Sequence, residues 1–93
     1  MSRESSDEEL LKIIIAGKDK DNEAIKSIYN KYVGPIYKYI FFHIGDKSEV
    51  EDITSEVFIK VIKNIKKIRD TSNYKAWIYR VAKNTISDYW RKH

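Results

Sequence analysis

Two clusters of side chains in this sequence have residue types and spacing suited to chemistry or binding, and the first is acidic. Asp52 and Glu56 are four residues apart, so on a helix both carboxylates lie on one face. Catalysis or metal binding would need partners from a second element, and His43 and His93 stand in no ligand-spaced motif. We therefore expect no catalytic residue, metal or cofactor. The acids either complement a helix dipole or contact a basic partner helix, beside exposed apolar residues such as Phe58.

The second cluster is basic and aromatic and fills the last third of the chain. Residues 57–93 hold ten of the 18 basic and two of the 14 acidic side chains, a net charge of +8. A positive track with aromatic faces is the combination that holds single-stranded nucleic acid, although a solvated lysine-rich surface would give the same charge. The cations are Arg69, Lys75, Arg80, Lys83, Arg91 and Lys92, the amides Asn64, Asn73 and Asn84, and the aromatic residues Tyr74, Trp77, Tyr79 and Trp90.

Helical periodicity runs through nearly the whole chain, and no segment alternates apolar and polar residues as a strand would. A capping box at Ser6–Glu9 predicts a first helix that ends at Gly17 and is followed by a polar connector. Asn22 is expected to cap a second helix, which should be kinked at Gly34–Pro35 and should end at Gly45.

A second capping box, at Ser48–Glu51, predicts a third helix whose apolar stripe reaches Ile68. Its first half is acidic and its second half basic, an order that complements the helix dipole at both ends. Residues 69–73 are predicted to form a loop, and Ser72 or Asn73 is expected to cap the last helix. The predicted fold class is all-α, a compact bundle of about four helices.

The last helix is expected to carry both core and surface positions. Trp77 lies on its apolar stripe, so core packing is the favoured interpretation for this side chain. Tyr79, Lys83 and Trp90 lie away from the centre of that stripe, and we expect them to be exposed.

Length and composition limit the setting in which the chain works. Its 93 residues favour one domain, and it contains no cysteine for disulfides or thiolate metal sites. No apolar run approaches the roughly 20 residues that a membrane span needs, and the first residues lack the features of a signal peptide. We expect a cytoplasmic protein without membrane insertion.

Two runs of residues are distinctive when they are taken together. EDITSEVFIK at 51–60 and YKAWIYRVAKNT at 74–85 resemble the second domain of extracytoplasmic-function sigma factors, small alternative sigma subunits of bacterial RNA polymerase. The resemblance covers residues 22–93, whereas the short N-terminal helix and connector of residues 1–21 match more loosely. It implies a non-catalytic domain that binds core RNA polymerase and recognises and melts the promoter −10 element during transcription initiation.

The resemblance also implies roles for individual residues. In the family the acidic helix docks on the β′ clamp helices of core polymerase, and the matching positions are Asp52, Glu56, Phe58 and Ile59, with Lys60 and Lys63 nearby. A base flipped out of the non-template strand enters a pocket formed by Asn64, Ile68, Val81 and Asn84 and closed by Arg69, Asp70, Thr71 and Ser72. The last helix follows promoter DNA through Lys75, Arg80, Lys83, Ser87 and Arg91.

Two departures from the family pattern and two alternatives remain. Ser55 stands where members often carry glutamine, and nothing here matches the −35-binding helix-turn-helix domain of full-length members. An excised fragment explains this more simply than a naturally single-domain protein.

The alternatives are a general helical nucleic-acid binder, whose affinity would be base-independent and salt-sensitive, and a protein-interaction module. The second is compatible with the resemblance, since sigma factors of this type are commonly held by an anti-sigma factor.

Overall fold

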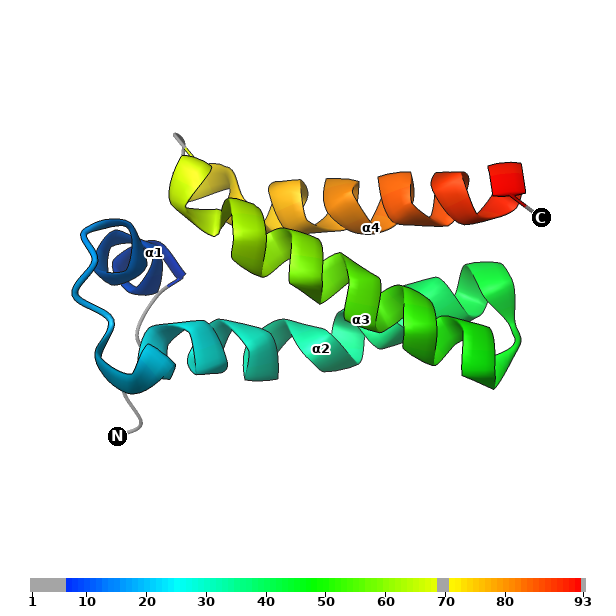
Figure 1. The fold of residues 1–93 in the computed structure, drawn as a ribbon, viewed down its shortest axis with the longest axis horizontal. Coiled ribbons are helices and arrows are strands. Elements are labelled where there is room, and N and C mark those ends of the chain that lie inside the picture. Colours follow the sequence, from blue (N-terminus) through cyan, green and yellow to red (C-terminus); the bar gives the residue numbers. More distant parts are fainter. Residues whose placement is uncertain (1–6, 69–70, 93) are drawn as a thin grey trace.

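The structure, a computed structural model, describes residues 7–68 and 71–92. This part of the chain forms helices and no strand, which confirms the predicted all-α class (Figure 1). The α-helices are α1 (Asp7–Ile15), α2 (Glu23–Ile44), α3 (Lys47–Asn64) and α4 (Tyr74–Lys92). Short 3₁₀ helices connect them, namely η1 (Lys20–Asn22), η2 (Ile65–Lys67) and η3 (Thr71–Asn73).

Helix α1 is short and is held by its apolar face. Leu11 and Ile14 are fully buried against the rest of the bundle. The helix stops as predicted at Gly17, whose φ of +72° suits glycine and whose amide donates to the Ile14 carbonyl at 3.0 Å. Ser6, the predicted cap, lies outside the described residues.

The start of α2 differs from the prediction. Asn22 is in the left-handed region, with a φ of 59°, and its side chain makes no capping hydrogen bond. The carboxylate of Asp19 takes that role and accepts hydrogen bonds from the amides of Ala24 at 2.6 Å and Ile25 at 3.1 Å. One carboxylate thus satisfies two free amides and places a negative charge at the positive end of the helix dipole.

Helix α2 contains Pro35 and continues past it as one helix to Ile44, before Gly45 with a φ of +85°. Helix α3 begins two residues earlier than the capping box predicts, because its cap is Asp46 and not Ser48. Asp46 is its cap and accepts a hydrogen bond from the Glu49 amide at 3.2 Å, because the sharp turn at Gly45 brings that carboxylate to the helix start.

The core lies where α2, α3 and α4 meet, around the fully buried Ile36, Val57 and Ile78. Phe58 belongs to this core and is only 4% exposed. Its ring meets that of Tyr29 edge-on, with a centroid distance of 5.0 Å, because this side of α3 packs against α2. The predicted exposure of Phe58 is therefore wrong. The apolar stripe that follows α3 continues through η2 rather than through a longer helix.

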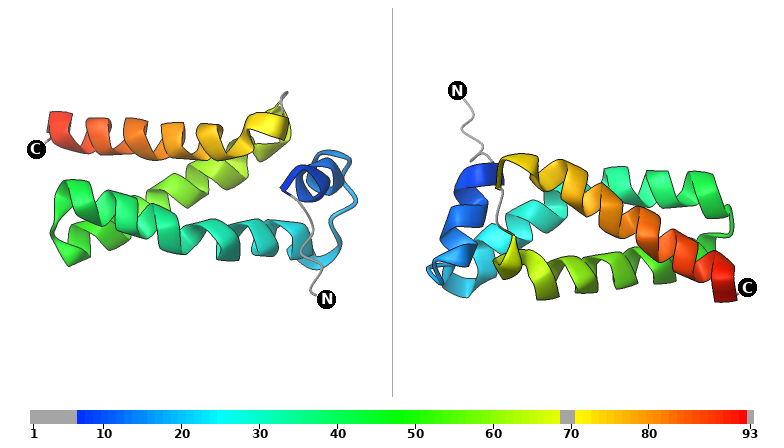
Figure 2. Two further views of the ribbon diagram at one scale, coloured as in Figure 1. Left: turned by 180° about the vertical axis from the view of Figure 1, so that it is seen from behind. Right: turned by 90° about the horizontal axis from the view of Figure 1, so that it is seen from above.

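The arrangement of the helices brings distant segments together. Helix α4 lies diagonally over α2 and α3, and α1 crosses the end of the bundle where α3 leads into α4 (Figure 2). There α1 contacts α2, η2 and η3. None of the described helices combines the length and the apolar character that crossing a membrane would require.

Candidate nucleic-acid and protein interfaces

A hollow of about 450 Å³ opens between the C-terminal half of α3 and the middle of α4. The four predicted pocket residues, which come from separate parts of the chain, all line it: Asn64, Ile68, Val81 and Asn84. Its other lining residues are Lys60, Lys67, Trp77 and Thr85. Of the residues predicted to close over a base, Ser72 is exposed in η3, whereas Arg69, Asp70 and the side chain of Thr71 lie outside the described part. We call this hollow the α3–α4 pocket.

Hydrogen bonds within the helices decide which polar atoms the pocket can offer. Asn64 Nδ2 donates one hydrogen to the Lys60 carbonyl at 2.8 Å, so its Oδ1 and its second Nδ2 hydrogen are left for a ligand. Thr85 Oγ1 donates to the Val81 carbonyl at 2.7 Å and accepts from Lys60 Nζ at 3.2 Å. Lys60 was predicted to lie near the polymerase contact, and its Nζ does lie 3.2 Å from Glu56, but it also reaches α4 and lines this pocket.

Aromatic side chains of α4 divide between the core and the surface. Trp77 is half-buried and packs on the core as predicted, yet it also forms part of the pocket wall. Tyr79 was predicted to be exposed. It is instead partly buried against Tyr39, with a ring centroid distance of 5.4 Å. Trp90 is 54% exposed, which agrees with the prediction. A flat aromatic surface at the pocket wall is what base stacking requires.

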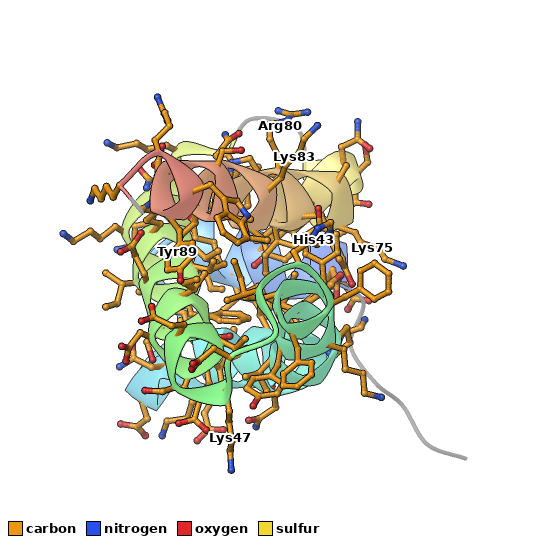
Figure 3. All side chains as sticks on the ribbon, turned by 90° about the vertical axis from the view of Figure 1, so that its right-hand side faces the viewer. His43, Lys47, Lys75, Arg80, Lys83 and Tyr89 are labelled. Atoms are coloured by element: carbon orange, nitrogen blue, oxygen red, sulfur yellow. The ribbon has the colours of Figure 1, made fainter. Side chains whose placement is uncertain are left out.

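The outer face of α4 is basic. Arg80, Lys83, Ser87 and Arg91 are exposed and recur at intervals of three or four residues, so they share one face of the helix. Figure 3 shows Arg80 and Lys83 pointing outward from α4, whereas Lys75 points to another side. Four of the five residues predicted to follow DNA are thus brought together, and Lys75 is exposed but separate.

The outer face of α3 is the candidate protein interface. Asp52, Glu56, Ile59 and Lys63 are exposed and lie at helical spacing along it. Ile62, which was not predicted, is 45% exposed and adds a second apolar side chain beside Ile59. The sequence could have indicated this exposed side chain, because Ile62 is an isoleucine that lies outside the apolar stripe of buried positions on α3. Phe58 faces away from this surface, toward α2.

A smaller hollow of about 190 Å³ lies between the N-terminal half of α3 and the end of α4, and we call it the acidic hollow. Burial there and the carboxylates of Glu49 and Asp46 raise the pKa of Tyr89, which lines it. The described residues bring together no group of histidine, cysteine and carboxylate side chains suited to a metal ion. The remaining lining residues are Glu49, Asp52, Ile53, Glu56, Thr85, Asp88 and Lys92.

Comparison with known proteins identifies the fold. Residues 28–93 match the family model "Sigma-70 region 2". The chain belongs to this family. It is 35% identical over 69 residues to the ECF RNA polymerase sigma factor SigM of Bacillus subtilis, covering 74% of the chain and 42% of that relative. To SigW of the same organism it is 33% identical over 75 residues, covering 81% and 40%.

A third relative, the ECF sigma factor BldN of Streptomyces coelicolor, is 24% identical over 89 residues, or 95% of the chain and 34% of the relative. The chain therefore spans well under half of the length of the relatives described. No solved structure shows a significant match. The resemblance found in the two sequence runs is confirmed, and the sigma region 2 match extends over most of α2 and all of α3 and α4.

Proposed function

We propose that this chain binds core RNA polymerase and helps to open promoter DNA by holding a flipped base of the −10 element in the α3–α4 pocket. The observation that carries the proposal is the convergence of Asn64, Ile68, Val81 and Asn84 on one hollow. These residues come from both sides of the connection between α3 and α4. The pocket offers what an unstacked base needs, namely amide groups for its edge and an indole for its face.

The basic face of α4 supplies the second part of the proposal. A strand that places one base in the pocket must keep its phosphates close to the protein, and Arg80, Lys83 and Arg91 lie on the outer side of the same helix. Unstacking a base costs a few kcal/mol, which contacts in the pocket and along the phosphates offset. The chain needs no catalytic group for this task, because polymerase supplies the chemistry.

The polymerase contact is assigned to the outer face of α3. Exposed Asp52 and Glu56 next to exposed Ile59 and Ile62 form a surface with an acidic part and an apolar part. Such a surface suits a basic partner helix, and the β′ clamp helices are the partner that the family implies. In this proposal residues 22–93 form the sigma region 2 unit. The chain works in the cytoplasm. A −35-binding domain and an anti-sigma factor act together with this unit.

The decisive experiment mixes the chain with core polymerase and a panel of fluorescent single strands that carry −10-like elements. The proposal expects co-elution with polymerase and a preference for the non-template strand that depends on the base at one position. Affinity that is equal for all sequences and falls steeply with salt would instead identify a general nucleic-acid binder. Failure to bind polymerase would remove the assignment of the α3 face.

A further inference from the structure

Helix α1 lies outside the family match, which starts at residue 28, yet a continuous series of side-chain contacts connects it with the α3–α4 pocket. The series starts at Asp7, in the first turn of α1. Its carboxylate accepts a hydrogen bond from the hydroxyl of Tyr32 and pairs with Lys31 Nζ at 2.7 Å. Both partners belong to α2, so Asp7 fastens α1 to that helix.

The series continues through aromatic rings. The ring of Tyr32 meets that of Tyr74 edge-on, with a centroid distance of 5.6 Å and an interplanar angle of 75°. Tyr74 is the first residue of α4 and in turn contacts Trp77, also with a centroid distance of 5.6 Å. Trp77 forms part of the pocket wall. One hydrogen bond and two ring contacts thus connect Asp7 with the wall of the proposed base site.

The environment of Tyr74 makes these ring contacts important. Its side chain is 1% exposed, and its hydroxyl has no hydrogen-bond partner among the described residues. A buried ring without a polar anchor is positioned by its packing neighbours alone. Tyr32 is one of those neighbours, and its hydroxyl is anchored by the hydrogen bond to Asp7.

We propose that Asp7 is a positioning residue for the α3–α4 pocket, acting through Tyr32 and Tyr74 to hold the indole of Trp77 against the incoming base. This inference rests on the proposed base-binding function and adds α1 to the machinery. Contacts of α1 with η2 and η3, which lie on both sides of the connection between α3 and α4, support the same role. Losing the Asp7 contacts would give the indole more freedom and weaken its stacking on the base.

The test uses Asp7→Asn, which removes the charge at nearly constant size, and Tyr32→Phe, which removes the hydroxyl but keeps the ring. The matched control is Glu8→Gln on the same helix, where an exposed carboxylate pairs only loosely with Lys12 at 3.8 Å. Each variant is titrated with a −10 strand and with the same strand abasic at the pocket position. Trp77 emission is followed in a Trp90→Phe background, and circular dichroism checks that the helices remain formed.

We expect both variants to reduce the preference for the −10 strand over the abasic strand, measured as the ratio of the two affinities, about three- to tenfold. This is the scale of coupling within a contact network. The affinity for the abasic strand should stay constant, and the base-dependent change in Trp77 emission should shrink. Glu8→Gln should behave as the parent chain. An unchanged ratio, or an equal loss on both strands, would overturn the role of Asp7. A parent chain that binds the two strands alike would refute the base pocket itself, and the role of Asp7 with it.

Discussion

The α3–α4 pocket and the acidic hollow lie along the same pair of helices, but they present opposite chemistry. The pocket is lined by lysines, asparagines and an indole and measures about 450 Å³. The acidic hollow is lined by four carboxylates together with Lys92 and measures about 190 Å³. Thr85 lines both, and between them Lys60 Nζ lies 3.2 Å from Glu56 and 3.9 Å from Asp88.

The difference follows from the order of charges along α3. Acidic residues occupy its first turns and lysines its last turns, which is the arrangement favoured by the helix dipole. The same order that stabilises the helix therefore gives its two ends different binding properties. One end suits phosphates and bases, and the other suits a basic protein surface. A substitution at one end should therefore affect binding at that end alone, as long as the core that both ends share stays folded.

The largest effect is expected from a change to that shared core. Phe58→Ala should lower the free energy of unfolding by about 3–5 kcal/mol, because it removes a buried ring between α3 and α2. Ile59→Ala, one residue further and 54% exposed, should change it by no more than about 0.5 kcal/mol. Urea unfolding of both variants gives the comparison. Similar losses for the two would mean that Phe58 is not a core residue.

The acidic end can be tested by reversing one charge. Asp52→Arg should weaken binding to core polymerase by about 100-fold, since like charges placed together cost several kcal/mol. Binding of a −10 strand to the free chain should not fall. Glu23→Arg, which also reverses one exposed acidic charge but on α2, serves as the control. Undiminished co-elution of the Asp52 variant with polymerase would remove the docking assignment.

The pocket end can be tested at a single amide. Asn84→Ala should cost about 1–3 kcal/mol at one promoter base and leave the other positions and polymerase binding unchanged. Competition with strands that carry each of the four bases measures this preference. Asn30→Ala, an exposed asparagine on α2, is the matched control. If the four bases compete with the variant as they do with the parent chain, the base is read elsewhere.

The smallest effect concerns the basic face beside the pocket. Lys83→Ala should weaken binding to every sequence by the same factor and lower the slope of log affinity against log salt by about one. Lys26→Ala, on the exposed side of α2, should leave that slope unchanged. Titrations at several salt concentrations distinguish the two, and a loss confined to one base would contradict a phosphate role for Lys83.

Much of this organisation could be predicted from the sequence, because helix periodicity and the sigma-like runs extend over many residues. Helix α4 begins at Tyr74, directly after the predicted cap positions Ser72 and Asn73, and the four pocket positions meet in one hollow. Caps were harder to predict, since several polar residues near each helix start could serve. Asp19 and Asp46 act where Asn22 and Ser48 were expected, because the path of the turn decides which side chain reaches the free amides.

Side-chain direction was the other limit of the sequence. Phe58 and Ile59 are adjacent and both apolar, and only the crossing of α3 over α2 decides which one is buried. Lys60 was expected beside the acidic surface, and it does pair with Glu56, but the sequence did not show that its ammonium group also reaches Thr85 on α4. The role proposed for Asp7 had no local signal at all, because two of its three contacts join residues 25 or more positions apart.

The position of Lys60 has a thermodynamic consequence. Its ammonium group contributes to the wall of the α3–α4 pocket while it is held by Glu56, a residue of the exposed acidic surface. Any ligand that engages Glu56 alters the field that Lys60 presents to the pocket. Linkage then requires reciprocity: the factor by which the first ligand changes affinity at the pocket equals the factor by which a pocket ligand changes affinity at the acidic surface.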